Sequence, residues 1–162
     1  GLAVRRATRR TGFRAMSTDP PDFAAFLSRP YRIEWGHCDP AGIVYAPRFL
    51  EMFGESTIML FEKALGVRKR DMLKAQGVIG FPMVDVSARF LRPAAYSDEV
   101  LLEAEAPAFG NSSFTIRHRL LKDGAVCVEG TEKRVWTVRD TDRPGGMRAE
   151  RVPDAVREMF AR

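Results

Sequence analysis

The chain has 162 residues, of which 45% are hydrophobic and 29% charged, and its formal charge is +5. This composition is typical of an ordinary globular domain and argues against disorder as the default state. No apolar run approaches the roughly 18 residues that a membrane helix needs, so we expect no membrane segment. Cys38 and Cys127 lie far apart and form no CxxC pair. They favour reduced thiols and a cytoplasmic location, although one long-range disulfide stays open.

The excess positive charge is confined to the N-terminus. Residues 1–16 hold five of the 26 basic residues and no acid, so the rest of the chain balances 21 basic against 21 acidic residues. A folded nucleic-acid-binding domain usually carries its positive charge on one face, so we expect no nucleic acid partner. We expect residues 1–22 to be a disordered basic tail or an upstream or cloning remnant, and residues 23–162 to form one domain. Nucleic acid binding through the tail is the alternative.

Hydrophobic periodicity predicts the first elements. Residues 31–36 alternate apolar and charged side chains, as a half-buried strand does. Residues 47–65 predict a helix, because Pro47 suits a first helical turn and Gly66 suits a helix end. Apolar residues cover most of its circumference, so we expect this helix to be buried on nearly all sides. The interior Gly54 predicts a close approach to the helix backbone.

A short helix over residues 69–77 precedes four runs of β-forming residues and a last helix over residues 153–162. The four runs are residues 81–93, 98–109, 112–122 and 125–139. Asp123 and Gly124 predict a hairpin turn between the last two runs. One strand, one buried helix and an antiparallel meander of four strands indicate an α+β architecture. The sheet edges of a single copy would be exposed, so we expect a dimer.

The stretch RIEWGHCDPAGIVYAPRF, residues 32–49, resembles the aspartate-dependent branch of the 4-hydroxybenzoyl-CoA thioesterase family. The match is dense over residues 31–53 and looser but collinear to about residue 139. The resemblance implies the hotdog fold, an antiparallel β-sheet wrapped around one long central α-helix. It also implies hydrolysis of an acyl-CoA, above all an aryl-CoA such as hydroxybenzoyl- or benzoyl-CoA. The expected homo-oligomer is a dimer or a dimer of dimers with active sites shared between subunits, and no cofactor is expected beyond the CoA of the substrate.

The chemistry of the HCDPAGIVY loop agrees with this resemblance. The carboxylate of Asp39 can attack a thioester carbonyl or take a proton from water. Amides at a helix N-terminus favour the oxygen that becomes negative, and the resemblance assigns this role to the backbone amide of Ala46. An Asp in such a loop is also a common turn residue, and this alternative stays open. Glu55 is the backup carboxylate.

Candidates for binding the acyl group follow from side-chain chemistry. Tyr45, Phe81 and Pro82 offer aromatic and apolar surface for a flat ring, with core packing as the alternative. His37 could orient Asp39 or the substrate, or serve the structure alone.

The phosphates of CoA favour Arg or Lys at the mouth of a cleft. In one group of members of the family that this chain resembles, the turn before the fourth strand is rich in both. Here that turn holds the uncharged Asn111, Ser112 and Ser113, which can still form hydrogen bonds. Arg89 and Arg92 are the nearest cationic substitutes, with an exposed strand position as the alternative.

Other functions remain open at this point. No set of His, Cys, Asp and Glu has the spacing of metal ligands, and GxGxxG and P-loop patterns are absent, so we expect no metal and no nucleotide chemistry. A hotdog hydratase would need His37 or His118 beside a carboxylate, but we expect His118 to be a core or interface residue. Hydrolysis of fatty acyl-CoA or of acyl-carrier-protein thioesters, and binding of thioesters without catalysis, are the remaining alternatives.

Overall fold

The computed structural model describes residues 23–75 and 77–161. The proposed tail, residues 1–22, therefore lies outside the described residues. The main antiparallel sheet has the order β1-β4-β6-β7-β3, with β5 added beside β6. Its strands are β1 (Ala25–Arg32), β3 (Met83–Phe90), β4 (Glu99–Glu105), β5 (Ala108–Phe109), β6 (Ser113–Lys122) and β7 (Ala125–Val135). The smaller sheet contains β2 (Val78–Gly80), β8 (Thr137–Arg139) and β9 (Met147–Ala149).

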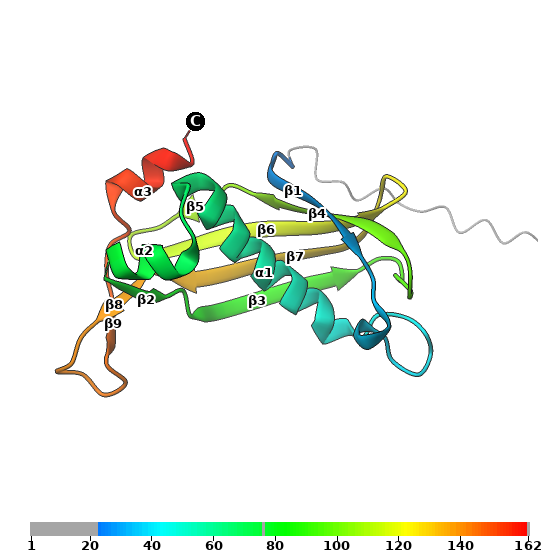
Figure 1. Cartoon of the computed structure of the whole chain (residues 1–162), viewed down its shortest axis with the longest axis horizontal. Coiled ribbons are helices and arrows are strands. Elements are labelled where there is room, and N and C mark those ends of the chain that lie inside the picture. Colours follow the sequence, from blue (N-terminus) through cyan, green and yellow to red (C-terminus); the bar gives the residue numbers. More distant parts are fainter. Residues whose placement is uncertain (1–22, 76, 162) are drawn as a thin grey trace, which may run out of the picture.

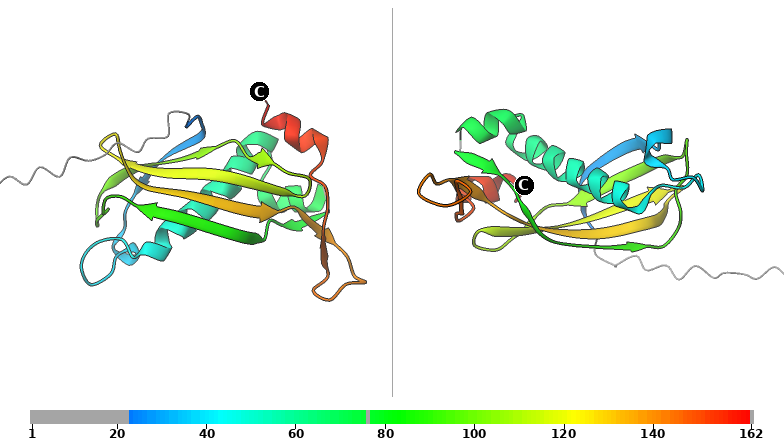
Figure 2. Two further views of the ribbon diagram at one scale, coloured as in Figure 1. Left: turned by 180° about the vertical axis from the view of Figure 1, so that it is seen from behind. Right: turned by 90° about the horizontal axis from the view of Figure 1, so that it is seen from below.

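One long helix crosses the concave face of the main sheet, which gives the α+β hotdog fold (Figures 1 and 2). This helix is α1 (Ala46–Leu65). It is accompanied by the 3₁₀ turn η1 (Trp35–His37) and by the short helices α2 (Lys69–Ala75) and α3 (Asp154–Met159). None of the helices among the described residues combines the length and the apolar character that crossing a membrane would require.

The locally encoded elements are confirmed. Helix α1 starts one residue before the predicted start and ends at the predicted residue, where Gly66 adopts a left-handed φ of 67°. Asp123 and Gly124 have positive φ values of 51° and 76° in the turn between β6 and β7, as the hairpin signal predicts. Both short helices form within the predicted ranges.

The prediction that α1 is buried on nearly all sides is wrong within one chain. Its buried side chains lie on the face toward the sheet, whereas Glu51, Glu55, Met59 and Lys63 form an exposed stripe with a four-residue spacing. The single sheet covers the helix from one side only, so apolar Met59 stays 41% exposed.

The predicted strand over residues 31–36 is also wrong for most of its length. Strand β1 lies earlier and ends at Arg32, and the chain then turns through η1. The amide of Glu34 donates to Nδ1 of His37 (2.9 Å), and the amide of His37 donates to the carbonyl of Glu34 (3.0 Å). These local hydrogen bonds stabilise a turn where the apolar alternation predicts an extended chain.

The four predicted strands do not form a simple meander. Strands β4, β6 and β7 are consecutive neighbours, but β3 pairs with β7, and β4 has β1 on its other side. The connection over residues 91–98 does not form a tight hairpin. It crosses beside the loop that precedes α1, where the amide of Val44 donates to the carbonyl of Ala94 (2.8 Å). Strand β3 therefore ends the sheet.

Gly130 on β7 allows α1 to lie close to the sheet. A Cβ atom at this position would lie 2.8 Å from the ring of Phe53, which is buried in α1. We expect Gly130→Ala to lower the free energy of unfolding by about 1–3 kcal/mol, because the ring or the helix must shift. Gly80→Ala, where a Cβ atom meets nothing within 4 Å, is the matched strand control in urea unfolding. Equal stability of the two variants would contradict this packing.

Candidate functional site

The loop that contains Asp39 folds back on itself just before α1. The amide of Asp39 donates to the carbonyl of Ile43 (2.9 Å), and the amide of Tyr45 donates to the carbonyl of His37 (2.9 Å). Gly42 closes the turn with a φ of 81°, a value that suits glycine. Asp39 is thereby held opposite the residues that lead into the helix.

The carboxylate of Asp39 takes part in the turn through one oxygen. Its Oδ1 accepts a hydrogen bond from the amide of Ala41 (2.8 Å). This is the Asx turn expected if Asp39 is a turn residue. Within residues 23–75 and 77–161, Oδ2 has no hydrogen-bond partner. The side chain is half-buried rather than enclosed. The turn therefore fixes the carboxylate and leaves one oxygen available for chemistry.

The start of α1 offers an amide that the helix itself does not use. Ala46 is the first helical residue, and such a residue has no acceptor within its own helix. The preceding Tyr45 supplies no side-chain cap, Pro47 has no amide hydrogen, and the first turn contains no acid. Neither the cap residue nor the first turn therefore compensates the positive end of this helix, which suits an oxygen that becomes negative.

His37 contacts other groups than Asp39. Because Nδ1 accepts the amide hydrogen of Glu34, the neutral ring carries its proton on Nε2, which lies 3.2 Å from the hydroxyl of Tyr31. Burial, together with the negative charge of Glu55, raises the pKa of Tyr31 above its usual value. The ring of His37 thus supports the η1 turn.

Exposed aromatic side chains surround this end of the molecule. Tyr45 is 56% exposed, and the rings of Trp35 and Tyr96 meet edge to face with their centroids 5.6 Å apart. The sequence does not predict this pair of Trp35 and Tyr96. Trp35 lies inside the motif, but nothing in the sequence pairs it with a residue of the 91–98 connection.

The two arginines proposed for CoA differ in their surroundings. Arg89 forms an ion pair with Glu129 (3.3 Å) on the face of the sheet away from α1. Arg92 is exposed and follows β3, and its amide donates to the carbonyl of Cys127 (3.0 Å). Arg92 lies two residues before Ala94, whose carbonyl accepts the amide of Val44 in the Asp39 loop, whereas Arg89 pairs with a carboxylate.

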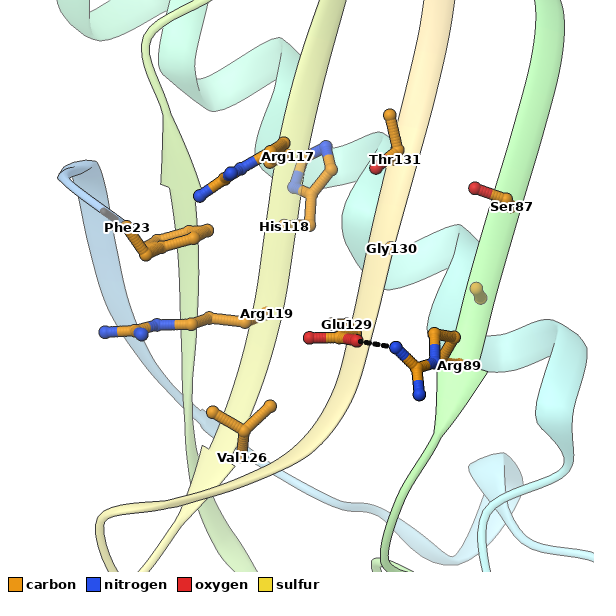
Figure 3. A pocket seen from close by; sticks show the side chains of 11 residues that line it. Phe23, Ser87, Arg89, Arg117, His118, Arg119, Val126, Glu129, Gly130 and Thr131 are labelled. Carbon is orange, nitrogen blue, oxygen red and sulfur yellow. Dashed lines mark ion pairs between the residues drawn. The ribbon is translucent and has the colours of Figure 1, made fainter. Parts of the chain in front are cut away.

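A cavity of about 280 Å³ opens on that outer face, between β3, β6 and β7 (Figure 3). Phe23 lies over it, between two arginines of β6. Each of the three arginines that line the cavity forms an ion pair: Arg89 with Glu129 (3.3 Å), Arg117 with Glu105 (2.7 Å) and Arg119 with Glu103 (2.6 Å). Because these charges are compensated, we assign the cavity no part in binding phosphate.

The remaining candidates lie at the opposite end of α1 (Figure 1). Phe81 is 5% exposed and packs in an aromatic cluster, with its ring 4.7 Å from that of Phe61. Pro82 is exposed, as is Asn111 in the turn between β5 and β6. A helix of 20 residues spans about 30 Å. One chain therefore does not bring these residues together with Asp39.

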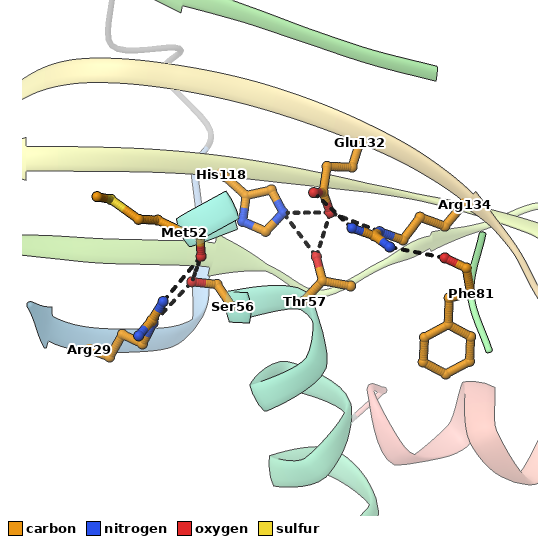
Figure 4. Close-up of polar contacts among 8 residues, drawn as sticks. All are labelled: Arg29, Met52, Ser56, Thr57, Phe81, His118, Glu132 and Arg134. Atoms are coloured by element: carbon orange, nitrogen blue, oxygen red, sulfur yellow. Dashed lines mark hydrogen bonds and ion pairs between the residues drawn. The ribbon is translucent and has the colours of Figure 1, made fainter. Parts of the chain in front are cut away.

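A buried polar network links α1 to the sheet between the two ends (Figure 4). Thr57 donates to the carboxylate of Glu132 (2.6 Å) and lies 3.2 Å from Nε2 of His118. Arg134 binds the same carboxylate through Nε and Nη2 (3.1 Å each) and also donates to the carbonyl of Phe81 (2.9 Å).

The network stabilises the ionised form of the Glu132 carboxylate. Burial alone would raise the pKa of Glu132, but hydrogen bonds from His118, Arg134 and Thr57 outweigh burial and lower this pKa from 4.5 to about 2. The guanidinium of Arg134 also fills the space over Gly54, 3.3 Å from where a Cβ atom would lie. This contact confirms the close approach predicted at Gly54. His118 is 1% exposed, in the core as expected.

Comparison with known proteins relates the whole domain to CoA thioesterases. Residues 33–160 match the family model described as the thioesterase-like superfamily. A 4-hydroxybenzoyl-CoA thioesterase from Pseudomonas sp. is 30% identical over 135 residues, which are 80% of this chain and 94% of that protein. A 1,4-dihydroxy-2-naphthoyl-CoA hydrolase from Synechococcus elongatus is 30% identical over 54% of this chain and 64% of its own length.

Solved structures give the same relationship. The 4-hydroxybenzoyl-CoA thioesterase from Pseudomonas sp. superposes with a TM-score of 0.74 at 28% identity, over 84% of this chain and 99% of that one. A gentisyl-coenzyme A thioesterase superposes with a TM-score of 0.70 at 26% identity, over 83% of this chain and 99% of that one.

Proposed function

Because this chain belongs to the thioesterase-like superfamily and is a thioester hydrolase, we propose that it hydrolyses aryl-CoA thioesters with Asp39 as the reacting carboxylate. The relatives named above act on CoA thioesters of aromatic acids, which supports this acyl class. The observation that carries the proposal is the geometry of the loop. Asp39 is fixed through one oxygen beside a helix N-terminus whose first amide is free of helical bonding.

The proposed chemistry uses this chain's own groups. The free oxygen of Asp39 either attacks the thioester carbon, giving an acyl anhydride that water then hydrolyses, or takes a proton from the attacking water. The carbonyl oxygen becomes negative in both routes and accepts a hydrogen bond from the amide of Ala46, at the positive end of α1. The CoA thiolate leaves and is protonated. No cofactor is required beyond the CoA of the substrate.

We further propose that the working unit contains a two-fold dimer paired through β3. This strand bonds only β7 among the described strands, so its other edge is open. Its inner face carries apolar side chains that α1 leaves partly exposed, including Val84 (58% exposed), Val86 (38%) and Phe90 (53%). An open edge beside an apolar stripe favours pairing with a second copy.

Two-fold symmetry would bring the separated halves of the site together. Pro82 directly precedes β3, whereas Phe90 at its other end lies next to Phe49 in the first turn of α1, with ring centroids 5.9 Å apart. A strand that pairs with its own copy across a two-fold axis is antiparallel. The Asp39 end of one chain then lies beside Phe81, Pro82 and residues 110–113 of the second chain.

Thiol release from a panel of thioesters tests the proposed function. The panel contains benzoyl-CoA, 4-hydroxybenzoyl-CoA, fatty acyl-CoA of several lengths and one acyl-carrier-protein thioester. We expect kcat/KM to be highest for an aryl-CoA. A higher kcat/KM for a fatty acyl-CoA or for the carrier-protein thioester would replace aryl-CoA as the substrate class. Hydrolysis of none of these thioesters would favour a binding protein over an enzyme.

A further inference from the structure

The turn between β5 and β6 is fixed by hydrogen bonds to three successive carbonyls. Nη2 of Arg157, on α3, donates to the carbonyls of Gly110 (2.6 Å) and Asn111 (2.8 Å). The amide of Val152 also donates to the carbonyl of Asn111 (2.9 Å), and the amide of Trp136 donates to the carbonyl of Ser112 (2.8 Å). The C-terminal segment therefore determines the direction of these peptide groups.

This arrangement turns two amides away from the C-terminal segment. In a trans peptide the N–H points opposite to the C=O of the same plane, and the described residues contain no cis bond. Since the carbonyls of Gly110 and Asn111 face Arg157, the amides of Asn111 and Ser112 face the other way. Neither amide has a protein acceptor among residues 23–75 and 77–161. Gly110 and Asn111 are exposed, so solvent reaches the turn.

Arg157 is held in place and carries a charge that no carboxylate neutralises. Its Nε donates to the carbonyl of Val152 (3.0 Å), and its guanidinium carbon lies 5.3 Å from the ring centre of Phe109. Within the described part of the chain, no Asp or Glu forms an ion pair with it. A cation bound to a carbonyl oxygen polarises the peptide group and strengthens its N–H as a donor.

We propose that Arg157 is a positioning residue that presents the amides of Asn111 and Ser112 to a phosphate group of CoA. This inference rests on the proposed function, because it concerns the carrier of the same substrate. Paired backbone amides bind anions without charged side chains. They would replace the Arg and Lys side chains that this turn lacks, with the positive charge supplied from α3.

Kinetics on two carriers of one acyl group test the proposal. Benzoyl-CoA carries the phosphates, and S-benzoyl-N-acetylcysteamine lacks them. We expect Arg157→Gln to raise KM for benzoyl-CoA about tenfold with kcat nearly unchanged, and to leave kcat/KM for the short thioester unchanged. Arg157→Lys keeps the charge but not the planar fork, so its KM should lie between those of the wild type and Arg157→Gln. S-benzoyl-dephospho-CoA, which lacks the 3′-phosphate, shows which phosphate is bound. If the amides bind the 3′-phosphate, Arg157→Gln should no longer raise KM for this substrate; if they bind the diphosphate, the increase in KM should remain.

Arg151→Gln is the matched control, because it removes the same charge from the same segment. Arg151 already pairs with Asp154 (2.7 Å), so we expect its KM values to stay at the wild-type level. If Arg157→Gln lowers kcat/KM equally for both thioesters, Arg157 serves only the fold. If the variant is active and its KM for benzoyl-CoA is unchanged, the inference is overturned. A wild type that hydrolyses neither thioester would instead refute the proposed function, and this inference with it.

Discussion

Replacing Asp39 by asparagine is expected to lower kcat for an aryl-CoA about a thousandfold, while the dissociation constant of the substrate changes little. Asparagine has the same shape and keeps an oxygen that can accept the amide hydrogen of Ala41 (2.8 Å), so the Asx turn survives. The variant loses the negative charge and the basic oxygen, which both routes of the reaction need. Thiol release gives kcat, and calorimetry on the inactive variant gives the affinity.

Asp123→Asn is the matched control, because Asp123 lies in the exposed β6–β7 turn and loses the same charge. Its activity should equal that of the wild type. If Asp39→Asn stays fully active, Asp39 is a turn residue only. The next carboxylate to test is then Glu55, which is exposed on α1 and pairs with Arg29 (3.4 Å).

Glu132→Ala is expected to lower the free energy of unfolding by about 3–5 kcal/mol, because it leaves buried partners without their carboxylate. Glu132 is 1% exposed and accepts hydrogen bonds from Thr57 and Arg134. Glu129→Ala on the same strand is the control. Glu129 pairs with the exposed Arg89, and its loss should cost about 1 kcal/mol or less. Urea unfolding measures both, and similar losses would contradict a special role of the network.

The same carboxylate predicts how stability depends on pH. The pKa of Glu132 is lowered from 4.5 to about 2 in the folded chain. Its charged form therefore adds stability that is fully present above pH 4.5 and is lost as the pH falls through about 2, by about 3 kcal/mol in all. Glu132→Gln lacks this group. Between about pH 5 and about pH 2, the free energy of unfolding of the wild type should fall relative to that of Glu132→Gln. If the two free energies change in parallel with pH, the assignment is refuted.

The parts of the fold that the sequence predicts are those encoded locally. Gly66 marks the end of α1 because a left-handed residue needs little more than its own backbone, and the Asp123–Gly124 turn is specified by two residues. The apolar spacing along β6 likewise predicts the buried position of His118. In each case the determining contacts lie within a few residues along the chain.

The parts that could not be predicted depend on distant segments. Nothing near β3 indicates that it pairs with β7, because its neighbour is chosen by how the 91–98 connection crosses the end of α1. The role of Arg157 is equally hidden, since its acceptors lie 46 and 47 residues away. The separation of Asp39 from the turn at residues 110–113 follows from the length of α1 and is visible only in the folded chain.

If a second copy of the chain completes the site, the activity per chain must depend on the fraction of chains that form dimers. The most direct test is the specific activity on an aryl-CoA across a dilution series, with the dimer fraction measured in parallel by analytical ultracentrifugation. Val86→Lys on the exposed inner face of β3 should shift dissociation to higher concentration, and Ser87→Lys on the outer face is its control. We predict that activity per chain falls in proportion to the dimer fraction. Full activity in monomeric protein would contradict a site shared between two chains.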